Sequence, residues 1–216
     1  ARAASPDPPP RSHRRRPRCI SSCSLGRRII PASGRVSNGE KGLAAGRGAW
    51  FARRMEALDI RPATRDDLPA IVEIYNEAVR NTTGTYDAEP HTLEQRMAWL
   101  EHYEAKGFPV LVENSGRAWG SLSPFVERPG FKHTAVCSVY VAEMARGQGL
   151  GTGLLKALLG EGIRRGLHTV LAAVDGANEA SLRLHEKLGF TRVGCFLEIA
   201  HKDGRWYDVV YLQRML

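Results

Sequence analysis

The chain has 216 residues, of which 25% are charged and 43% hydrophobic, a composition that predicts one globular domain together with an additional segment. Its formal net charge of +8 is unevenly distributed, because residues 1–54 carry +11 and residues 55–216 carry −3. The larger segment therefore gives no reason to expect a nucleic-acid partner. No stretch approaches the roughly 18 consecutive apolar residues of a membrane-spanning helix, so no membrane partner is expected either.

The N-terminal segment, residues 1–54, opens with "SPDPPPRSHRRRPR" and continues through Gly- and Ser-rich sequence. Because it has few apolar residues to bury, we expect it to be disordered. Its arginines and serines resemble an organelle transit peptide, although the prolines disfavour the amphipathic helix of such peptides. Two other interpretations stay open. One is that Met55 is the natural start, with residues 1–54 being over-extended translation or a fusion remnant. The other is a nucleic-acid-binding tail, which the lack of interleaved aromatic residues disfavours.

The four cysteines lack the close, paired spacing with nearby histidines that marks a zinc site or a disulfide framework. Cys19 and Cys23 lie in the N-terminal segment, and Cys137 and Cys195 lie in apolar stretches of the larger one. We therefore expect no metal, a reducing compartment and a cytoplasmic location, with organelle targeting by the basic leader as the alternative.

From residue 58 onward, the hydrophobic periodicity alternates between strand and helix. A short strand over residues 58–61 precedes a helix over 64–81, where apolar residues recur every three or four positions behind a Thr/Asp start signal. A second helix, over residues 91–107, ends at a glycine. Residues 108–114 and 117–125 then form a predicted strand pair joined by the turn "NSGR".

The second half of the chain repeats this alternation around a glycine-rich stretch. A strand over residues 132–141 leads into the glycines, an apolar helix follows to Arg165, and residues 168–174 read as a buried strand. A helix over residues 178–189 has an Asn cap and a Gly stop, and two strands flank the turn "HKDG" at the end. This order predicts an α/β domain over residues 55–216, with a central mixed twisted sheet of about six or seven strands flanked by about four helices.

The stretch "RGQGLGTGLL" joins a strand to a helix, where backbone N–H groups and the helix N-terminus favour a phosphate. An NTPase loop would need Lys-Ser/Thr after the last glycine, but Leu154 follows Gly153. A dinucleotide-binding fingerprint fails as well, because Thr152 stands where the third glycine belongs. On the residues alone, a phosphate cradle and a glycine-rich turn without a ligand both stay open.

Two linked motifs resemble the GNAT N-acetyltransferase superfamily. The pattern Arg146-x-x-Gly149-x-Gly151 resembles its acetyl-CoA pyrophosphate loop, and "NEASLRLHEKLGF" resembles its second signature helix, with Asn178, Ser181, His185, Gly189 and Phe190 in the motif positions. The finer details "NTTGTY", "SVYV" and "GRWYD" resemble the phosphinothricin and methionine sulfone acetyltransferase branch. The resemblance covers roughly residues 58–214 and implies the GNAT fold.

The resemblance implies that a substrate amine attacks acetyl-CoA directly in a ternary complex, between parallel strands that splay apart. It assigns acetyl-CoA binding to the strand "SVYV", the glycine loop and the signature helix: Val139, Tyr140, Val141, Arg146, Gly147, Gln148, Gly149, Leu150, Gly151, Thr152, Asn178 and Ser181.

The proton acceptor of the family does not transfer to this sequence. Relatives in the branch commonly carry a Glu base two residues before the Ser of "SVYV", and Val136 occupies that position here. The resemblance implies His185 as the catalytic residue, since it stands where the superfamily has a Tyr general acid and an imidazole can act as acid or base near neutral pH. His133 and Glu143 are weaker alternatives, and Cys137 is interpreted as a core residue.

For the acceptor, Tyr86 and Trp206 are candidate walls and Lys132 is a candidate carboxylate ligand. The resemblance implies an N-acetyltransferase for a small-molecule amine, probed best with amino acids such as phosphinothricin, methionine sulfone and methionine sulfoximine, and it is consistent with a homodimer. Two alternatives stay open: an acyl-CoA-binding domain with weakened catalysis, motivated by Val136, and a protein N-acetyltransferase.

Overall fold

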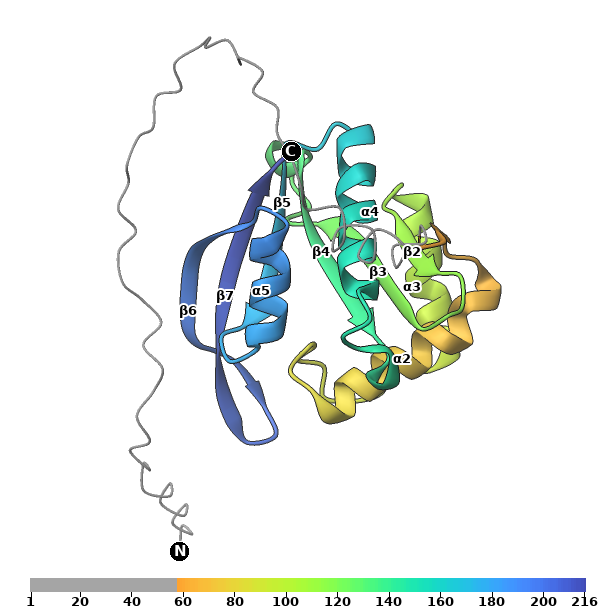
Figure 1. The fold of residues 1–216 in the computed structure, drawn as a ribbon, viewed down its shortest axis with the longest axis horizontal. Coiled ribbons are helices and arrows are strands. Elements are labelled where there is room, and N and C mark those ends of the chain that lie inside the picture. The colour runs from red at the N-terminus through yellow and green to blue at the C-terminus, as the bar shows by residue number, and fades with distance from the viewer. Residues whose placement is uncertain (1–57) are drawn as a thin grey trace, which may run out of the picture. The chain divides into compact units, whose positions relative to one another are not determined.

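The computed structural model describes residues 58–216, so the predicted basic extension over residues 1–54 lies outside the described residues. The described part is one α/β unit with a seven-stranded sheet and four α-helices, which confirms the predicted fold class. Figure 1 shows its strands, β1 (Ile60–Pro62), β2 (Val110–Glu113), β3 (Ala118–Pro124), β4 (Thr134–Val141), β5 (Thr169–Asp175), β6 (Thr191–Lys202) and β7 (Arg205–Met215), and its helices, α2 (Leu68–Asn81), α3 (Leu93–Ala105), α4 (Leu150–Arg164) and α5 (Glu179–Lys187).

The strands lie in the order β1-β2-β3-β4-β5-β7-β6. Neighbouring strands are antiparallel except β4 and β5, which are parallel and are connected through α4. A parallel pair needs such a crossover, whereas an antiparallel pair can be joined by a short turn, as β2–β3 and β6–β7 are here. The one parallel pair therefore lies in the middle of the sheet, with the glycine-rich stretch at the end of β4.

The two faces of the sheet carry different helices. Trp119 on β3 belongs to the apolar cluster formed with α2 and α3, whereas a Cβ on the next residue, Gly120, would lie 3.0 Å from Leu158 of α4. Successive residues of a strand face opposite sides of the sheet, so α2 and α3 cover one face and α4 covers the other. The helix α5 joins α4 there, since Leu184 lies 3.4 Å from the Cβ position of Gly151 (Figure 1).

The predicted first helix is divided at its start. Residues Arg65–Asp67 form a 3-10 turn and α2 begins at Leu68, with Pro69 in its first turn, where a missing N–H costs nothing. Arg61 on β1 fixes this entry by donating hydrogen bonds of 2.7 and 2.8 Å to the carboxylate of Asp67. These bonds outweigh the effect of burial and hold the pKa of Asp67 at about 2.

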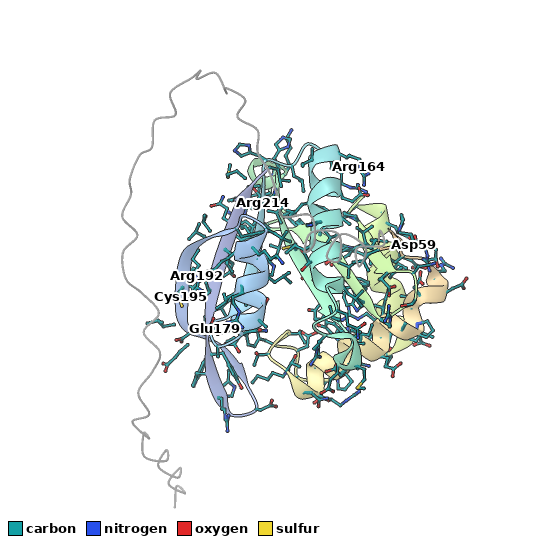
Figure 2. All side chains as sticks on the ribbon, in the orientation of Figure 1. Asp59, Arg164, Glu179, Arg192, Cys195 and Arg214 are labelled. Atoms are coloured by element: carbon teal, nitrogen blue, oxygen red, sulfur yellow. The ribbon has the colours of Figure 1, made fainter. Side chains whose placement is uncertain are left out.

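The outer strand β6 is tied back to the domain through Arg192, which donates a 2.7 Å hydrogen bond to Glu186 of α5; Arg192 is labelled on β6 in Figure 2. Between residues 58 and 216, the structure contains no helix with the length and apolar character needed to cross a membrane.

Candidate active site

The candidate site is the gap that opens between β4 and β5. The two strands pair only over Thr134–Val136 and Thr169–Leu171, and from Cys137 onward they diverge. A cleft of about 740 Å³ fills the divergence, walled by β4 on one side and by the end of β5 on the other. The predicted splay of the parallel strands is thus present.

The backbone of β4 faces this cleft at the residues that the motif indicates. Leu122 directs its N–H away from β4, to the carbonyl of Pro109, so the residues next to it on β3 are the ones that bond β4. Ser138 is paired with one of those residues. Because backbone groups alternate along a strand, Val139 and Val141 direct theirs toward β5, across the cleft. An extended amide chain lying in the cleft would find hydrogen-bonding partners there.

The glycine loop closes the wide end of the cleft. Gly147 and Gly149 have φ angles of 77° and 87°, a left-handed conformation that glycine adopts without strain, and a Cβ at either would meet no atom within 4 Å. Gly149 is the N-cap of α4, so the N–H groups of the first turn face the cleft without intrahelical acceptors. An open cradle of N–H groups at a helix N-terminus fits a pyrophosphate.

Arg146 anchors the loop through its side chain. Its guanidinium donates to both oxygens of Glu77 on α2, at 2.6 and 2.9 Å, and to the carbonyl of Val141 at 3.2 Å. Gln148 points elsewhere, donating to the carbonyl of Met144 at 3.1 Å, and is not among the residues that line the cleft. The structure therefore brings the rest of the predicted cofactor set to one cleft and leaves Gln148 beside it.

The start of α5 forms the floor of the cleft. Asn178 caps the helix, since its side-chain oxygen accepts the N–H of Ser181 at 3.0 Å, and both residues line the cleft. The carbonyl of Ser181 in turn accepts a hydrogen bond from Nδ1 of His185, at 2.8 Å. A carbonyl oxygen can only accept, so the proton of the neutral imidazole resides on Nδ1 and Nε2 carries the lone pair.

His185 is 6% exposed and lies against the cleft. Burial lowers the pKa of His185, a shift that the hydrogen bond to Ser181 only partly opposes, so the ring is neutral at neutral pH. Its Nε2 lies 3.8 Å from Sγ of Cys137. Burial raises the pKa of Cys137 to about 12, so this residue is a thiol and not a thiolate nucleophile. Cys137 is buried, as predicted, but it also lines the cleft.

A second hollow of about 360 Å³ adjoins the cleft, and the two share Thr82, Thr83, Asp175 and Asn178. Thr83 follows α2, and its hydroxyl donates a 2.5 Å hydrogen bond to Asp175 at the end of β5. Lys202, 6% exposed, holds the same loop from the β6–β7 hairpin by donating to the carbonyls of Thr82 and Thr85 at 2.8 and 3.0 Å. We refer to this region, formed by the loop after α2, the end of β5 and the β6–β7 hairpin, as the acceptor side.

The predicted acceptor residues lie at different distances from this region. Tyr86 is in the loop after α2, with its ring 5.9 Å from that of Tyr207, and its buried hydroxyl has no hydrogen-bond partner among the described residues. Lys132 is exposed before β4, at the end of the strand remote from the glycines. Trp206 is 62% exposed on the β6–β7 hairpin, 4.8 Å from the ring of His201. None of Tyr86, Lys132 and Trp206 lines the cleft or the hollow, and their roles stay predictions.

The residues considered as a base are also separated. Val136 lies on the same face of β4 as Ser138 and does not line the cleft. His133 bonds the carbonyl of Gly166 at the far end of β4, and Glu143 is exposed beyond the cleft lining. The sequence interpretation missed Asp175. The sequence could have indicated it, because a polar residue at the end of a buried parallel strand lies at the edge of the sheet where ligands bind.

Comparisons with known proteins agree with this geometry. Residues 69–190 match the Acetyltransferase (GNAT) family. An L-methionine sulfoximine/L-methionine sulfone acetyltransferase of Pseudomonas aeruginosa is 41% identical over 161 residues, which cover 73% of this chain and 94% of the relative.

Two solved structures are similar in fold and in sequence. One is a ribosomal-protein-alanine N-acetyltransferase from Brucella melitensis, with a TM-score of 0.71 and 41% identity over 73% of this chain and 99% of that chain. The other is a phosphinothricin acetyltransferase from Sinorhizobium meliloti in complex with acetyl-CoA, with a TM-score of 0.70 and 32% identity over 73% of this chain and 87% of that chain. The chain therefore belongs to the GNAT family of acetyl-CoA-dependent N-acetyltransferases.

Proposed function

We propose that the protein moves the acetyl group of acetyl-CoA to the α-amine of a small amino acid. One observation carries the proposal: a cleft with a pyrophosphate cradle at one end opens directly into a polar hollow on the acceptor side. A thioester held along β4 would present its carbonyl carbon where the two spaces meet. An amine in the hollow could then attack it without an intermediate carrier.

We propose direct transfer in a ternary complex. The amine nitrogen forms a bond to the carbonyl carbon, the carbon–sulfur bond breaks, and the CoA sulfur leaves as a thiolate that takes up a proton. Support comes from Cys137, the one thiol on the cleft wall among the described residues, whose raised pKa makes it a poor nucleophile for a covalent acetyl-enzyme. The neutral ring of His185 is available to the proton transfer through Nε2.

We propose amino acids with a tetrahedral sulfur or phosphorus group in the side chain as the first substrates to examine. The support is the naming of relatives, which act on L-methionine sulfoximine, L-methionine sulfone and phosphinothricin. The hollow of about 360 Å³ is of a size for one such amino acid.

The test is release of free CoA thiol from acetyl-CoA with a panel of amines. The panel holds L-methionine sulfone, L-methionine sulfoximine, phosphinothricin, L-methionine and a short peptide with an N-terminal alanine. Turnover with the free amino acids supports the proposal. Turnover with the peptide alone would favour the protein N-acetyltransferase alternative, and acetyl-CoA binding without turnover of any amine would favour the acyl-CoA-binding alternative.

We also propose that the protein acts as a homodimer in the cytoplasm, where acetyl-CoA is available to it. The outer strand β6 exposes Val193, Phe196, Leu197 and Ile199, each at least 47% accessible, next to Cys195, which Figure 2 labels. Exposed apolar residues on an edge strand favour association with a second copy. Sedimentation of the wild-type protein and of Phe196→Glu tests the dimer, which is contradicted if both sediment as monomers.

A further inference from the structure

One carboxylate lines the cleft within the described part of the chain, and it is Asp175. It ends β5, is 7% exposed and accepts two hydrogen bonds, from the hydroxyl of Thr83 at 2.5 Å and from the N–H of Ala177 at 3.0 Å. A carboxylate in the region of the reacting groups is what the missing Glu at position 136 would otherwise supply. The question is whether Asp175 faces the amine and has capacity to bind it.

Asp175 faces the acceptor side. It lines both the cleft and the adjoining hollow, and its partner Thr83 belongs to the loop after α2. The charge of Asp175 also affects Tyr86 in the same loop. Burial raises the pKa of Tyr86 to about 12, and the negative charge of Asp175 contributes to that shift. His185, by contrast, lies on α5, on the other face of the sheet. The carboxylate and the imidazole therefore line the cleft from opposite faces of the sheet, and of the two only Asp175 also lines the hollow.

Asp175 retains capacity for an ammonium group. An ionised carboxylate offers about four lone-pair sites, and Thr83 and Ala177 occupy two of them. The two bonds hold the carboxylate in one orientation, so that an incoming ammonium does not have to order it.

The charges around the hollow suit an amino acid zwitterion. Arg80 of α2 lines the hollow together with Asp175 and offers a cation for a carboxylate, while Asp203 and Tyr207 line it from the hairpin. Lys202 is engaged with the loop carbonyls and does not line either space.

We infer that Asp175 receives the substrate ammonium and is the first acceptor of its proton, in place of the Glu that Val136 replaces. The inference rests on the proposed function. One proton passes from the ammonium nitrogen to a carboxylate oxygen of Asp175 and on to water, leaving a neutral amine. The amine then forms the carbon–nitrogen bond, the carbon–sulfur bond breaks, and the second nitrogen-bound proton neutralises the thiolate. No oxidant or further reactant is required.

A purely structural role for Asp175 is the competing explanation. Its bond to Ala177 shapes the turn that places Asn178 at the start of α5, and its bond to Thr83 ties two segments together. Asp175→Asn separates the roles, because an amide oxygen can still accept the Ala177 N–H and the amide nitrogen can donate to Thr83, while the negative charge is lost.

The experiment compares wild type, Asp175→Asn and Glu143→Gln, which makes the same carboxylate-to-amide change outside the cleft. Turnover is measured with the best amine of the panel, and acetyl-CoA affinity by calorimetry. We expect Asp175→Asn to lower kcat/KM for the amine about 100-fold or more, the usual contribution of a general base. Acetyl-CoA affinity should stay within about threefold, and Glu143→Gln should behave like wild type.

A rescue variant adds a second readout. Val136→Glu places a carboxylate on the face of the sheet that Asp175 occupies. The double variant Val136→Glu/Asp175→Asn should therefore have a kcat/KM at least about tenfold higher than Asp175→Asn alone. Equal turnover by wild type and Asp175→Asn overturns the inference and leaves the proposed function standing. A parallel loss of acetyl-CoA affinity, or no rescue by Val136→Glu, assigns Asp175 a structural role and also overturns it. If the wild-type protein acetylates no amine, both the proposed function and the inference about Asp175 are overturned.

Discussion

The cofactor side and the acceptor side of the cleft are lined by different kinds of groups. The cofactor side consists of backbone groups from one continuous stretch, Val139 to Thr152, completed by the cap of α5. The acceptor side consists of side chains from three segments far apart in the chain, joined by bonds such as Thr83–Asp175 and Lys202–Thr82. Backbone recognition depends on local conformation, whereas side-chain recognition depends on the assembled fold, and variants can separate the two.

The largest effect is expected from Gly149→Glu on the cofactor side. A carboxylate about 4 Å from a pyrophosphate charge costs about 4 kcal/mol at a surface-like dielectric, or about 1,000-fold in affinity, and φ of 87° adds strain for any side chain. Calorimetry should detect no acetyl-CoA binding. Gly160→Glu, on the same helix with open space around its Cβ position, is the control and should bind normally. Unchanged acetyl-CoA affinity in Gly149→Glu would show that this loop does not bind the cofactor.

His185→Gln comes second, with an expected loss of about 100-fold in kcat and little change in acetyl-CoA affinity. Because burial lowers the pKa of His185, the wild-type rate should fall only at pH values below the usual pKa range of histidine. The pH–rate profile of the variant should lack this decrease at low pH. The unfolded chain binds the proton more readily, so wild-type stability should decrease as pH falls below about 6.5, and less so in the variant.

The matched control for that variant is His133→Gln, which alters a histidine at the far end of β4. Wild-type kinetics in both variants would show that His185 does not act in catalysis. Thermal melts between pH 5.5 and 7.5 measure the stability difference.

On the acceptor side, Lys202→Met should raise KM for the amine by about tenfold, since two hydrogen bonds from a buried ammonium to the loop are lost. Acetyl-CoA affinity should not change. The exposed Lys156 of α4 gives the control, Lys156→Met. If acetyl-CoA affinity falls together with amine binding, the two sides are not separable.

The smallest effect is expected from Asp67→Asn, which affects neither side. Losing the bonds to Arg61 should lower Tm by roughly 2–4 °C at neutral pH without altering either substrate's kinetics. Since the pKa of Asp67 is about 2, this stabilisation is fully present above about pH 4 and disappears as pH falls toward 2. Asp66→Asn, an exposed neighbour, should melt like wild type, and equal melting of all three proteins would contradict the assignment.

The same contrast explains what the sequence could predict. Local signals determined the helices and strands, because caps such as Asn178 and periodic apolar residues act within a few positions. The glycine loop was readable for the same reason. Asp175 and Thr83 are 92 positions apart, and no local pattern indicates that they meet. Tyr86, Lys132 and Trp206 were selected by residue type and position in a motif, which cannot show whether a side chain lines the cleft.

The short pairing between β4 and β5 has a consequence for the sheet as a whole. Three residue pairs, Thr134–Val136 with Thr169–Leu171, join a four-stranded half to a three-stranded half. A pantetheine arm bonded to Val139 and Val141 would continue the pairing of β4 beyond the point where β5 diverges. Binding of acetyl-CoA would therefore favour, by mass action, the state in which the two parts of the sheet stay associated. Amide exchange at these two valines should slow when acetyl-CoA is added. Acetyl-CoA would then have two roles, as the donor of the acetyl group and as an added strand-like segment in the gap between β4 and β5.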